Sequence, residues 1–84
     1  MPACKVEWLE EAKEDIRALD RSTAMRVFDA VLHFTRTGAG NVTALHGDMA
    51  GAARLRVGDY RVLFTLQDGA MRIFGVRHRK EAYR

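Results

Sequence analysis

Hydrophobic and polar positions alternate along the first half of the chain with two different periods. Residues 4–8 alternate between apolar and charged side chains, which predicts a short strand with one buried face. From residue 9 the apolar positions recur at helical spacing, first over 9–19 and then over 24–34. Asp20 or Ser22 can cap the second of these segments. One strand followed by two helices is therefore expected here.

The second half of the chain has the period of two that is typical of strands. Residues 38–52 hold four of the seven glycines and lack a clear period, so we expect a loop with Leu45 held against the core. A loop of this length in a small domain favours a functional role. Three alternating stretches follow, separated by turns at Gly58-Asp59 and Asp68-Gly69: residues 54–57, 60–67 and 71–77.

The predicted element order is β-α-α-β-β-β, which indicates an α+β fold. Two helices would pack on one face of an antiparallel sheet, and residues 1–84 would form a single domain. A two-residue turn at Gly58-Asp59 pairs Arg56 with Arg61, Arg54 with Leu63, Leu55 with Val62 and Val57 with Tyr60. The second turn is expected to pair Phe64 with Ile73, Leu63 with Phe74, Val62 with Gly75 and Arg61 with Val76.

This pairing separates the side chains onto two faces, because directly opposite residues share a face. One face is apolar and would receive the helices: Leu55, Val57, Tyr60, Val62, Phe64, Leu66, Met71 and Ile73. The other face carries Arg54, Arg56 and Arg61 and is called the arginine face below. Its further expected members are Leu63, Thr65, Arg72, Phe74 and Val76, with His78 next in the alternation. A register slip of one residue would bury the arginines.

Charge is distributed unevenly along the chain. Residues 1–50 carry six Lys/Arg and eight Asp/Glu, a net −2, whereas residues 51–84 carry eight and three, a net +5. Such asymmetry indicates a polyanion or an acidic protein as partner. Like charges placed opposite each other, as for Arg56 and Arg61, destabilise a sheet. The arginine face therefore predicts a site for phosphate or carboxylate, although charge alone does not specify nucleic acid.

The chain end adds two residues that can carry protons. His78 can exchange a proton near neutral pH, and Tyr83 can do so if neighbouring cations lower its pKa. The alternative for Tyr83 is an ordinary packing contact at the end of the chain. The single cysteine, Cys4, cannot form an intramolecular disulfide, which favours a reducing compartment. With neither a signal peptide nor a membrane span in the sequence, a cytoplasmic location without a membrane partner is expected.

Two segments carry a resemblance to a known family. The sequence GDYRVLF at residues 58–64 and the sequence VRHRKEAYR at residues 76–84 occur in the order found in RelE/ParE toxins. The segment Leu45-His46-Gly47 and the strand before residues 12–16 are also similar to that family. The chain therefore resembles toxins of bacterial and archaeal toxin–antitoxin systems over essentially its whole length.

The RelE branch of this family implies a ribosome-dependent endoribonuclease that cuts messenger RNA in the ribosomal A site. Its chemistry needs no metal or other cofactor, because the ribose 2′-OH attacks the adjacent phosphate. By position, Arg61 would stabilise the transition state, Arg79 would assist or protonate the leaving group, and Tyr83 would be the base. His78 stands where some relatives have lysine and competes for the role of base. The expected RNA-binding residues are Arg54, Arg56, Arg77 and Lys80.

One departure from the family pattern leaves other functions open. RelE ribonucleases usually carry several lysines on the first hairpin strand, but Ala52 and Ala53 stand where one such lysine is expected. The alternatives are a ParE-like inhibitor of DNA gyrase without nuclease activity, or a non-toxic remnant that only binds. In each toxin reading the resemblance implies a cognate RelB-like antitoxin. Its acidic C-terminal segment would cover the basic face in a hetero-oligomer.

Overall fold

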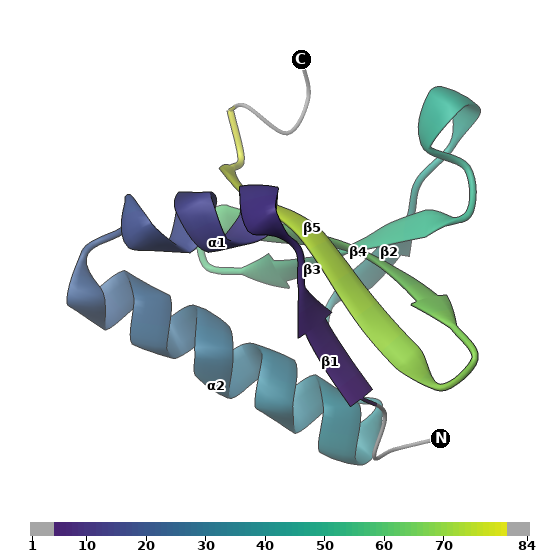
Figure 1. The fold of residues 1–84 in the computed structure, drawn as a ribbon, viewed down its shortest axis with the longest axis horizontal. Coiled ribbons are helices and arrows are strands. Elements are labelled where there is room, and N and C mark those ends of the chain that lie inside the picture. Colours follow the sequence, from purple (N-terminus) through teal and green to yellow (C-terminus); the bar gives the residue numbers. More distant parts are fainter. Residues whose placement is uncertain (1–4, 81–84) are drawn as a thin grey trace.

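Two helices and one sheet make up residues 5–80, the part of the chain that the computed structural model describes (Figure 1). The elements follow in this order: β1 (Lys5–Trp8), α1 (Glu10–Arg17), α2 (Arg21–Thr37), β2 (Val42–Ala44), the short 3-10 helix η1 (Gly47–Met49), β3 (Ala52–Val57), β4 (Tyr60–Gln67) and β5 (Ala70–His78). The predicted α+β fold, with both helices preceding the main strands, is confirmed.

The ends of α2 are defined by the residues that the sequence pattern indicates. Asp20 caps its start, where one side-chain oxygen accepts the N–H of Thr23 at 3.1 Å. Hydrogen bonds from the Thr23 hydroxyl and N–H hold the pKa of Asp20 below its ordinary value. At the other end Gly38 has a φ of +76° and donates its N–H to the Phe34 carbonyl at 2.8 Å. Glycine adopts this left-handed conformation without steric cost.

The strand order is β1-β5-β4-β3-β2, and the sheet is antiparallel except at β1. β1 lies parallel to the first half of β5, from Lys5 opposite Ala70 to Trp8 opposite Ile73. The prediction of an antiparallel sheet therefore holds for every other pair but not for this one. A parallel neighbour requires a long crossover, which the helices and the intervening strands supply.

The predicted loop over residues 38–52 contains an additional strand. β2 pairs with β3 along three residues, and η1 follows it. Leu45 is half-buried, and its N–H is bonded to the Ala52 carbonyl at 3.0 Å. The strand was missed because all three of its residues are exposed, so no alternation between buried and exposed positions marks it.

The register of the β3–β4 hairpin is confirmed at every predicted pair. The β4–β5 register agrees at Phe64 and Ile73 but is shifted beyond them by a β-bulge, so Leu63 faces Gly75 and Val62 faces Val76. A bulge places an extra residue on one strand and interrupts its alternation. Val76, which was expected on the arginine face, is therefore part of the core and only 4% exposed.

The core lies between the two helices and the apolar face of the sheet. Its centre is formed by side chains from β3, β4 and β5 that pack against Val27 and Val31 of α2 and Ala12 of α1. The Phe34 and Phe64 rings meet at a centroid distance of 5.5 Å. Neither α1 nor α2 covers the opposite face of the sheet (Figure 1), and this is the face that carries the arginines.

Candidate functional site

Arg61 lies at the centre of the arginine face and is the most buried of its arginines. Arg61 is on β4, the strand between β3 and β5, and the residue is 7% exposed. Nη1 donates to the Tyr60 carbonyl at 3.3 Å, whereas Nε is buried and has no hydrogen-bond partner within the described chain. An unsatisfied buried donor costs roughly 1–3 kcal/mol. A ligand would contact the small exposed part of Arg61 and could accept a hydrogen bond from Nε only after the side chain moves, because that atom is buried.

Two further arginines lie directly opposite Arg61. Arg56 is its partner on β3, is exposed, and donates from Nε to the Gly58 carbonyl at 3.5 Å. Arg77 is its partner on β5, in place of the expected Val76, because the bulge shifts the register by one residue. Arg54, half-buried, stands two residues before Arg56 on the same face. The predicted convergence of Arg54, Arg56 and Arg61 on one face is confirmed, and Arg77 joins them.

The charge of Arg77 is compensated by α1, unlike that of Arg56. Its Nε donates to Asp15 Oδ2 at 3.1 Å, and its terminal nitrogen is paired with Glu11. Burial alone would lower the pKa of Arg77, but the attraction of Asp15 and the contacts with Glu11 outweigh it and raise that pKa. The same Asp15 oxygen accepts the Val76 N–H at 2.9 Å. α1 thus fixes the second half of β5, beyond the end of β1.

His78 lies on the opposite side of the sheet from Arg61. It pairs with Tyr60, and the two rings meet edge to face at a centroid distance of 5.3 Å. Together with Asp15 and Leu19 these two rings line a cavity of about 280 Å³ on the helix side. The prediction that His78 continues the arginine face is wrong, because the bulge reverses the orientation of the residues that follow it.

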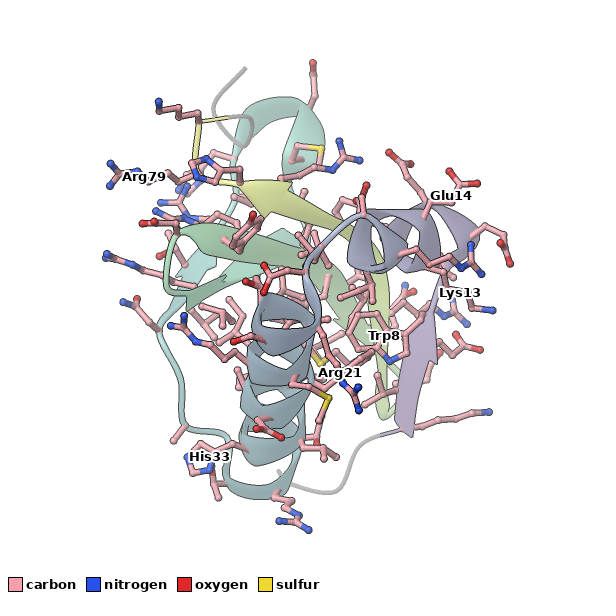
Figure 2. The ribbon with its side chains drawn as sticks, turned by 90° about the vertical axis from the view of Figure 1, so that its left-hand side faces the viewer. Trp8, Lys13, Glu14, Arg21, His33 and Arg79 are labelled. Carbon is pink, nitrogen blue, oxygen red and sulfur yellow. The ribbon has the colours of Figure 1, made fainter. Side chains whose placement is uncertain are left out.

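The first residue after β5, Arg79, is bonded to the turn between β3 and β4. The N–H of Arg79 is bonded to the Asp59 carbonyl at 2.7 Å, and the N–H of Lys80 is bonded to His78 Nδ1 at 3.3 Å. Both side chains are exposed, and Figure 2 shows Arg79 extending outward, far from His33 at the other end of the molecule. Tyr83, the predicted base, lies outside the described residues.

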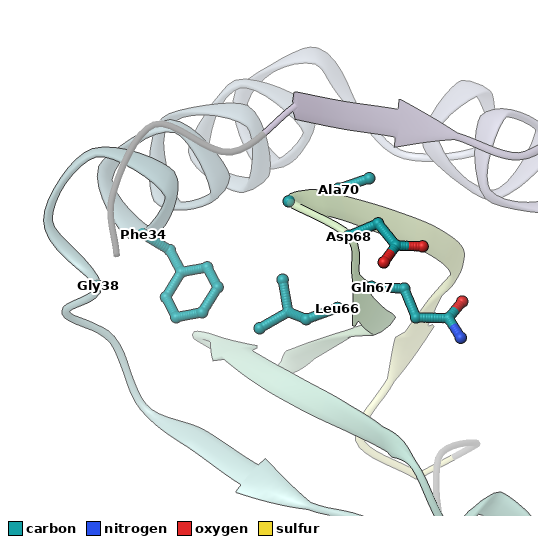
Figure 3. A pocket seen from close by; sticks show the side chains of 7 residues that line it. Phe34, Gly38, Leu66, Gln67, Asp68 and Ala70 are labelled. Carbon is teal, nitrogen blue, oxygen red and sulfur yellow. The ribbon is translucent and has the colours of Figure 1, made fainter.

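Two pockets flank the long hairpin of β4 and β5. One of about 270 Å³ lies on the helix side, where Phe34 and Leu66 face each other near Asp68 and Gly69 (Figure 3). The other, of about 440 Å³, is bounded by η1, Ala52, Thr65, Gln67 and Phe74. This second pocket was not predicted. The bulge beside it has a typical sign in the sequence, the isolated Gly75 within a strand.

Within residues 5–80, no cluster of three or more His, Cys, Asp or Glu side chains is arranged to hold a metal ion. Neither helix of this part of the chain is long and apolar enough to cross a membrane.

Comparison with known protein families shows to which family the chain belongs. Residues 6–83 match the family described as ParE toxin of the type II toxin–antitoxin system parDE. The chain belongs to this toxin family. The resemblance to RelE/ParE toxins stated from the sequence is therefore confirmed, and the protein is a toxin of a type II toxin–antitoxin system. No significant match is found among curated proteins.

Solved structures of related toxins share the fold of this ParE-family toxin. The RelBE2 toxin–antitoxin complex from Mycobacterium tuberculosis is similar at a TM-score of 0.83 and 23% identity, over 93% of each chain. The RelE-RelB complex from the archaeon Pyrococcus horikoshii is similar at a TM-score of 0.76 and 20% identity, over 92% of this chain and 96% of that one. The YoeB/ParE toxin from Agrobacterium tumefaciens is similar at a TM-score of 0.73 and 20% identity, over 88% and 96%.

Proposed function

We propose that this toxin is a metal-independent endoribonuclease that cleaves messenger RNA on the ribosome and binds the scissile phosphate at Arg61. The observation that carries the proposal is the buried Nε of Arg61, a cationic donor with no hydrogen-bond partner among the described residues. A guanidinium binds phosphate through charge-assisted hydrogen bonds, which are stronger than hydrogen bonds between neutral groups. RNA offers this ligand at every nucleotide.

In the proposed reaction, the phosphoryl group exchanges its bond to the 5′ oxygen for a bond to the neighbouring 2′ oxygen. A base removes the proton of the ribose 2′-OH, and the 2′ oxygen attacks the adjacent phosphorus. The bond from phosphorus to the 5′ oxygen breaks, and an acid donates a proton to that oxygen. The products are a 2′,3′-cyclic phosphate and a 5′-OH end. The negative charge that builds on the phosphate in the transition state is stabilised by fixed cationic donors, the role proposed for Arg61.

The remaining roles follow from the family resemblance and from the positions of the residues. Arg79 protonates the leaving oxygen or adds positive charge, since it extends from the chain end beside the β3–β4 turn. Tyr83 is the proposed base. His78 is the weaker candidate, because its ring packs on Tyr60 on the helix side.

The proposed contacts to the flanking RNA backbone come from four basic residues. Arg54 and Arg56 hold the phosphates next to the scissile one, together with Lys80. Arg77 takes part in a supporting role, because Asp15 and Glu11 already compensate its charge.

A cognate antitoxin is the proposed protein partner, in the cytoplasm. Similar toxins are described in complex with RelB in M. tuberculosis and P. horikoshii and with YefM in Staphylococcus aureus. An acidic segment of such a partner would compete with RNA for the arginine face, because both are anionic. Inhibition then follows from occupation of the phosphate site.

A second candidate is inhibition of DNA gyrase by binding, without cleavage of RNA. The family description names ParE. The cationic set is also smaller than a RelE nuclease implies, because Ala52 lies on the arginine face and Arg77 is compensated. These two observations keep the gyrase function as the alternative that an experiment must separate from the nuclease.

The test is cleavage of a defined messenger RNA on programmed ribosomes, with mapping of the new 5′ ends. We expect cuts within the A-site codon that Arg61→Ala slows by about 100-fold or more, the scale for loss of one transition-state donor. Arg36→Ala, on the exposed end of α2, is the matched control and should cleave like the wild type. Intact message together with gyrase-dependent DNA breaks in arrested cells would overturn the nuclease in favour of the second candidate.

A further inference from the structure

We infer that the pocket between η1 and the arginine face binds an unpaired RNA base, which stacks on Phe74. This inference rests on the proposed ribonuclease function and adds a base-binding subsite to its phosphate site. The pocket has a volume of about 440 Å³, within the range of sites for small organic groups.

Phe74 lies on the arginine side of β5, next to the buried Ile73, and it is the residue at which the β-bulge occurs. The bulge leaves the face of Phe74 unchanged but alters the residues that follow. Without it, the alternation that places Ile73 in the core would continue and bring Val76 onto the arginine face. With it, Phe74 is the extra residue on β5, so that Phe74 and Gly75 both fall on the arginine side and Val76 returns to the core. Phe74 is half-buried, and it lines the pocket together with Thr65 and Ala52.

The pocket lies on the same face of the sheet as the proposed phosphate site. Ala52 and Thr65 are paired across β3 and β4, and Arg54 and Arg61 lie on the same face of those two strands. Thr65 follows Arg61 by four residues on one strand, which corresponds to about 13 Å. An RNA strand with one phosphate at Arg61 would therefore bring the base of a nearby nucleotide to Phe74. The charge that attracts the backbone also selects RNA over an apolar peptide as the occupant.

The pocket combines an aromatic side chain with polar groups at its rim, as sites for unpaired bases do. Single-stranded RNA is recognised by stacking its bases on aromatic rings and by hydrogen bonds to the base edges. Asp48, Thr65 and Gln67 line the pocket with carboxylate, hydroxyl and amide groups. An ionised carboxylate only accepts hydrogen bonds, so Asp48 would bind an N–H group on the edge of a base.

The inference is tested on programmed ribosomes that carry a short mRNA with a 2′-deoxynucleotide at the cleavage position. This substitution blocks the 2′-OH attack and leaves the bases in place. 2-Aminopurine, a fluorescent base that stacking quenches, is introduced at each position of the exposed codon and its 3′ neighbour in turn. We expect quenching at one position with the wild-type toxin. Phe74→Leu should abolish it and weaken binding about tenfold, a loss typical of one base stacked on an aromatic ring.

Phe28→Leu is the matched control, because Phe28 is a partly exposed phenylalanine on the helix side of the sheet, and this variant should quench and bind like the wild type. Ala52→Leu is a second variant that fills the pocket and should reproduce the loss if Phe74→Leu proves unstable. An abasic nucleotide at the quenched position should weaken wild-type binding to the level of Phe74→Leu, with no further loss when the two changes are combined.

The outcomes separate the subsite from the proposed function. If both pocket variants bind and quench like the wild type while Arg61→Ala loses binding, the subsite is overturned and the ribonuclease stands. If the pocket variants weaken binding of the antitoxin but leave RNA binding unchanged, the pocket belongs to the protein partner and the inference is wrong. If the wild-type toxin neither binds nor cleaves the ribosomal message, the function and the subsite both fall.

Discussion

The two faces of the sheet differ in how well the side chains on each face pack, pair their charges and form hydrogen bonds. On the helix face, apolar side chains from three strands are covered by α1 and α2, and Val62, Met71 and Ile73 are fully buried. On the arginine face, Arg61 is almost equally buried but leaves Nε without a partner in the described chain, and Arg56 stands directly opposite it. Two residues that are neighbours in sequence, Arg61 and Val62, thus lie in opposite environments.

This difference separates stability from function in the molecule. Burial of apolar surface on the helix face stabilises the fold by roughly 25 cal/mol for each Å² removed from water. The opposed arginines and the unsatisfied donor on the other face act against folding, and an anionic ligand would offset them. Unfavourable local arrangements of this kind are typical of functional sites. Substitutions on the two faces should therefore change stability in opposite directions.

The largest expected effect comes from the helix face. Phe64→Ala should lower the free energy of unfolding by about 3–5 kcal/mol, because it removes a ring that packs on Phe34 and leaves a cavity. Leu66→Ala is the control, since Leu66 lies two residues further along the same strand but is 54% exposed, and we expect a loss below about 1 kcal/mol. Equilibrium unfolding in urea measures both. Equal losses would contradict the placement of Phe64, and not Leu66, within the core of this face.

The same contrast explains how much of the fold the sequence could predict. The pairing of β3 with β4 was predicted correctly because a two-residue turn and the need to bury Leu55 and Val62 leave a single register. These signals are local. The parallel pairing of β1 with β5 depends on residues more than 60 positions apart, and no local pattern of side chains specifies such a neighbour.

The candidate site could be predicted only in part, for a related reason. Arg54, Arg56 and Arg61 lie within one hairpin, so their alternation was sufficient to place them on one face. The positions of Arg77 and His78 depend on the bulge, which exchanges the faces of all later residues of β5. Only the interior Gly75 indicates it in the sequence. Likewise, nothing near Asp15 indicates that it binds the backbone and the side chain of residues 76 and 77.

A smaller change in stability is expected where Asp15 of α1 contacts the end of β5, at the edge of the arginine face. Asp15→Ala should lower the free energy of unfolding by about 2 kcal/mol, because the Val76 N–H and the Arg77 guanidinium both lose an acceptor. Asp15→Asn keeps an acceptor for Val76 and should cost about half as much. Thermal unfolding of the purified variants gives the comparison.

Glu11→Gln is the control for this contact, because its exposed carboxylate pairs with the same arginine but binds no backbone group. An exposed ion pair contributes about 0–1 kcal/mol, so we expect a change within that range that shrinks at high salt. If Glu11→Gln destabilised the protein as much as Asp15→Ala, the ion pairs alone would explain the contact and the bond to the Val76 N–H would contribute little.

The smallest expected change in stability, with the opposite sign, is at the centre of the arginine face. Arg61→Met replaces the buried cation by an unbranched apolar side chain and removes the unsatisfied donor and the repulsion from Arg56. Replacing buried charged groups by apolar ones is often neutral or stabilising, so the free energy of unfolding should stay equal or rise by about 1 kcal/mol.

The same variant should lose the stabilisation that a single-stranded RNA oligonucleotide gives the wild-type protein, since a ligand that binds only the folded state raises its stability. Arg56→Met, at the exposed partner position, should keep part of that stabilisation. A loss of about 2 kcal/mol or more in the absence of RNA would instead make Arg61 a structural residue, because a group held for ligand binding contributes its interaction energy only when the ligand is bound.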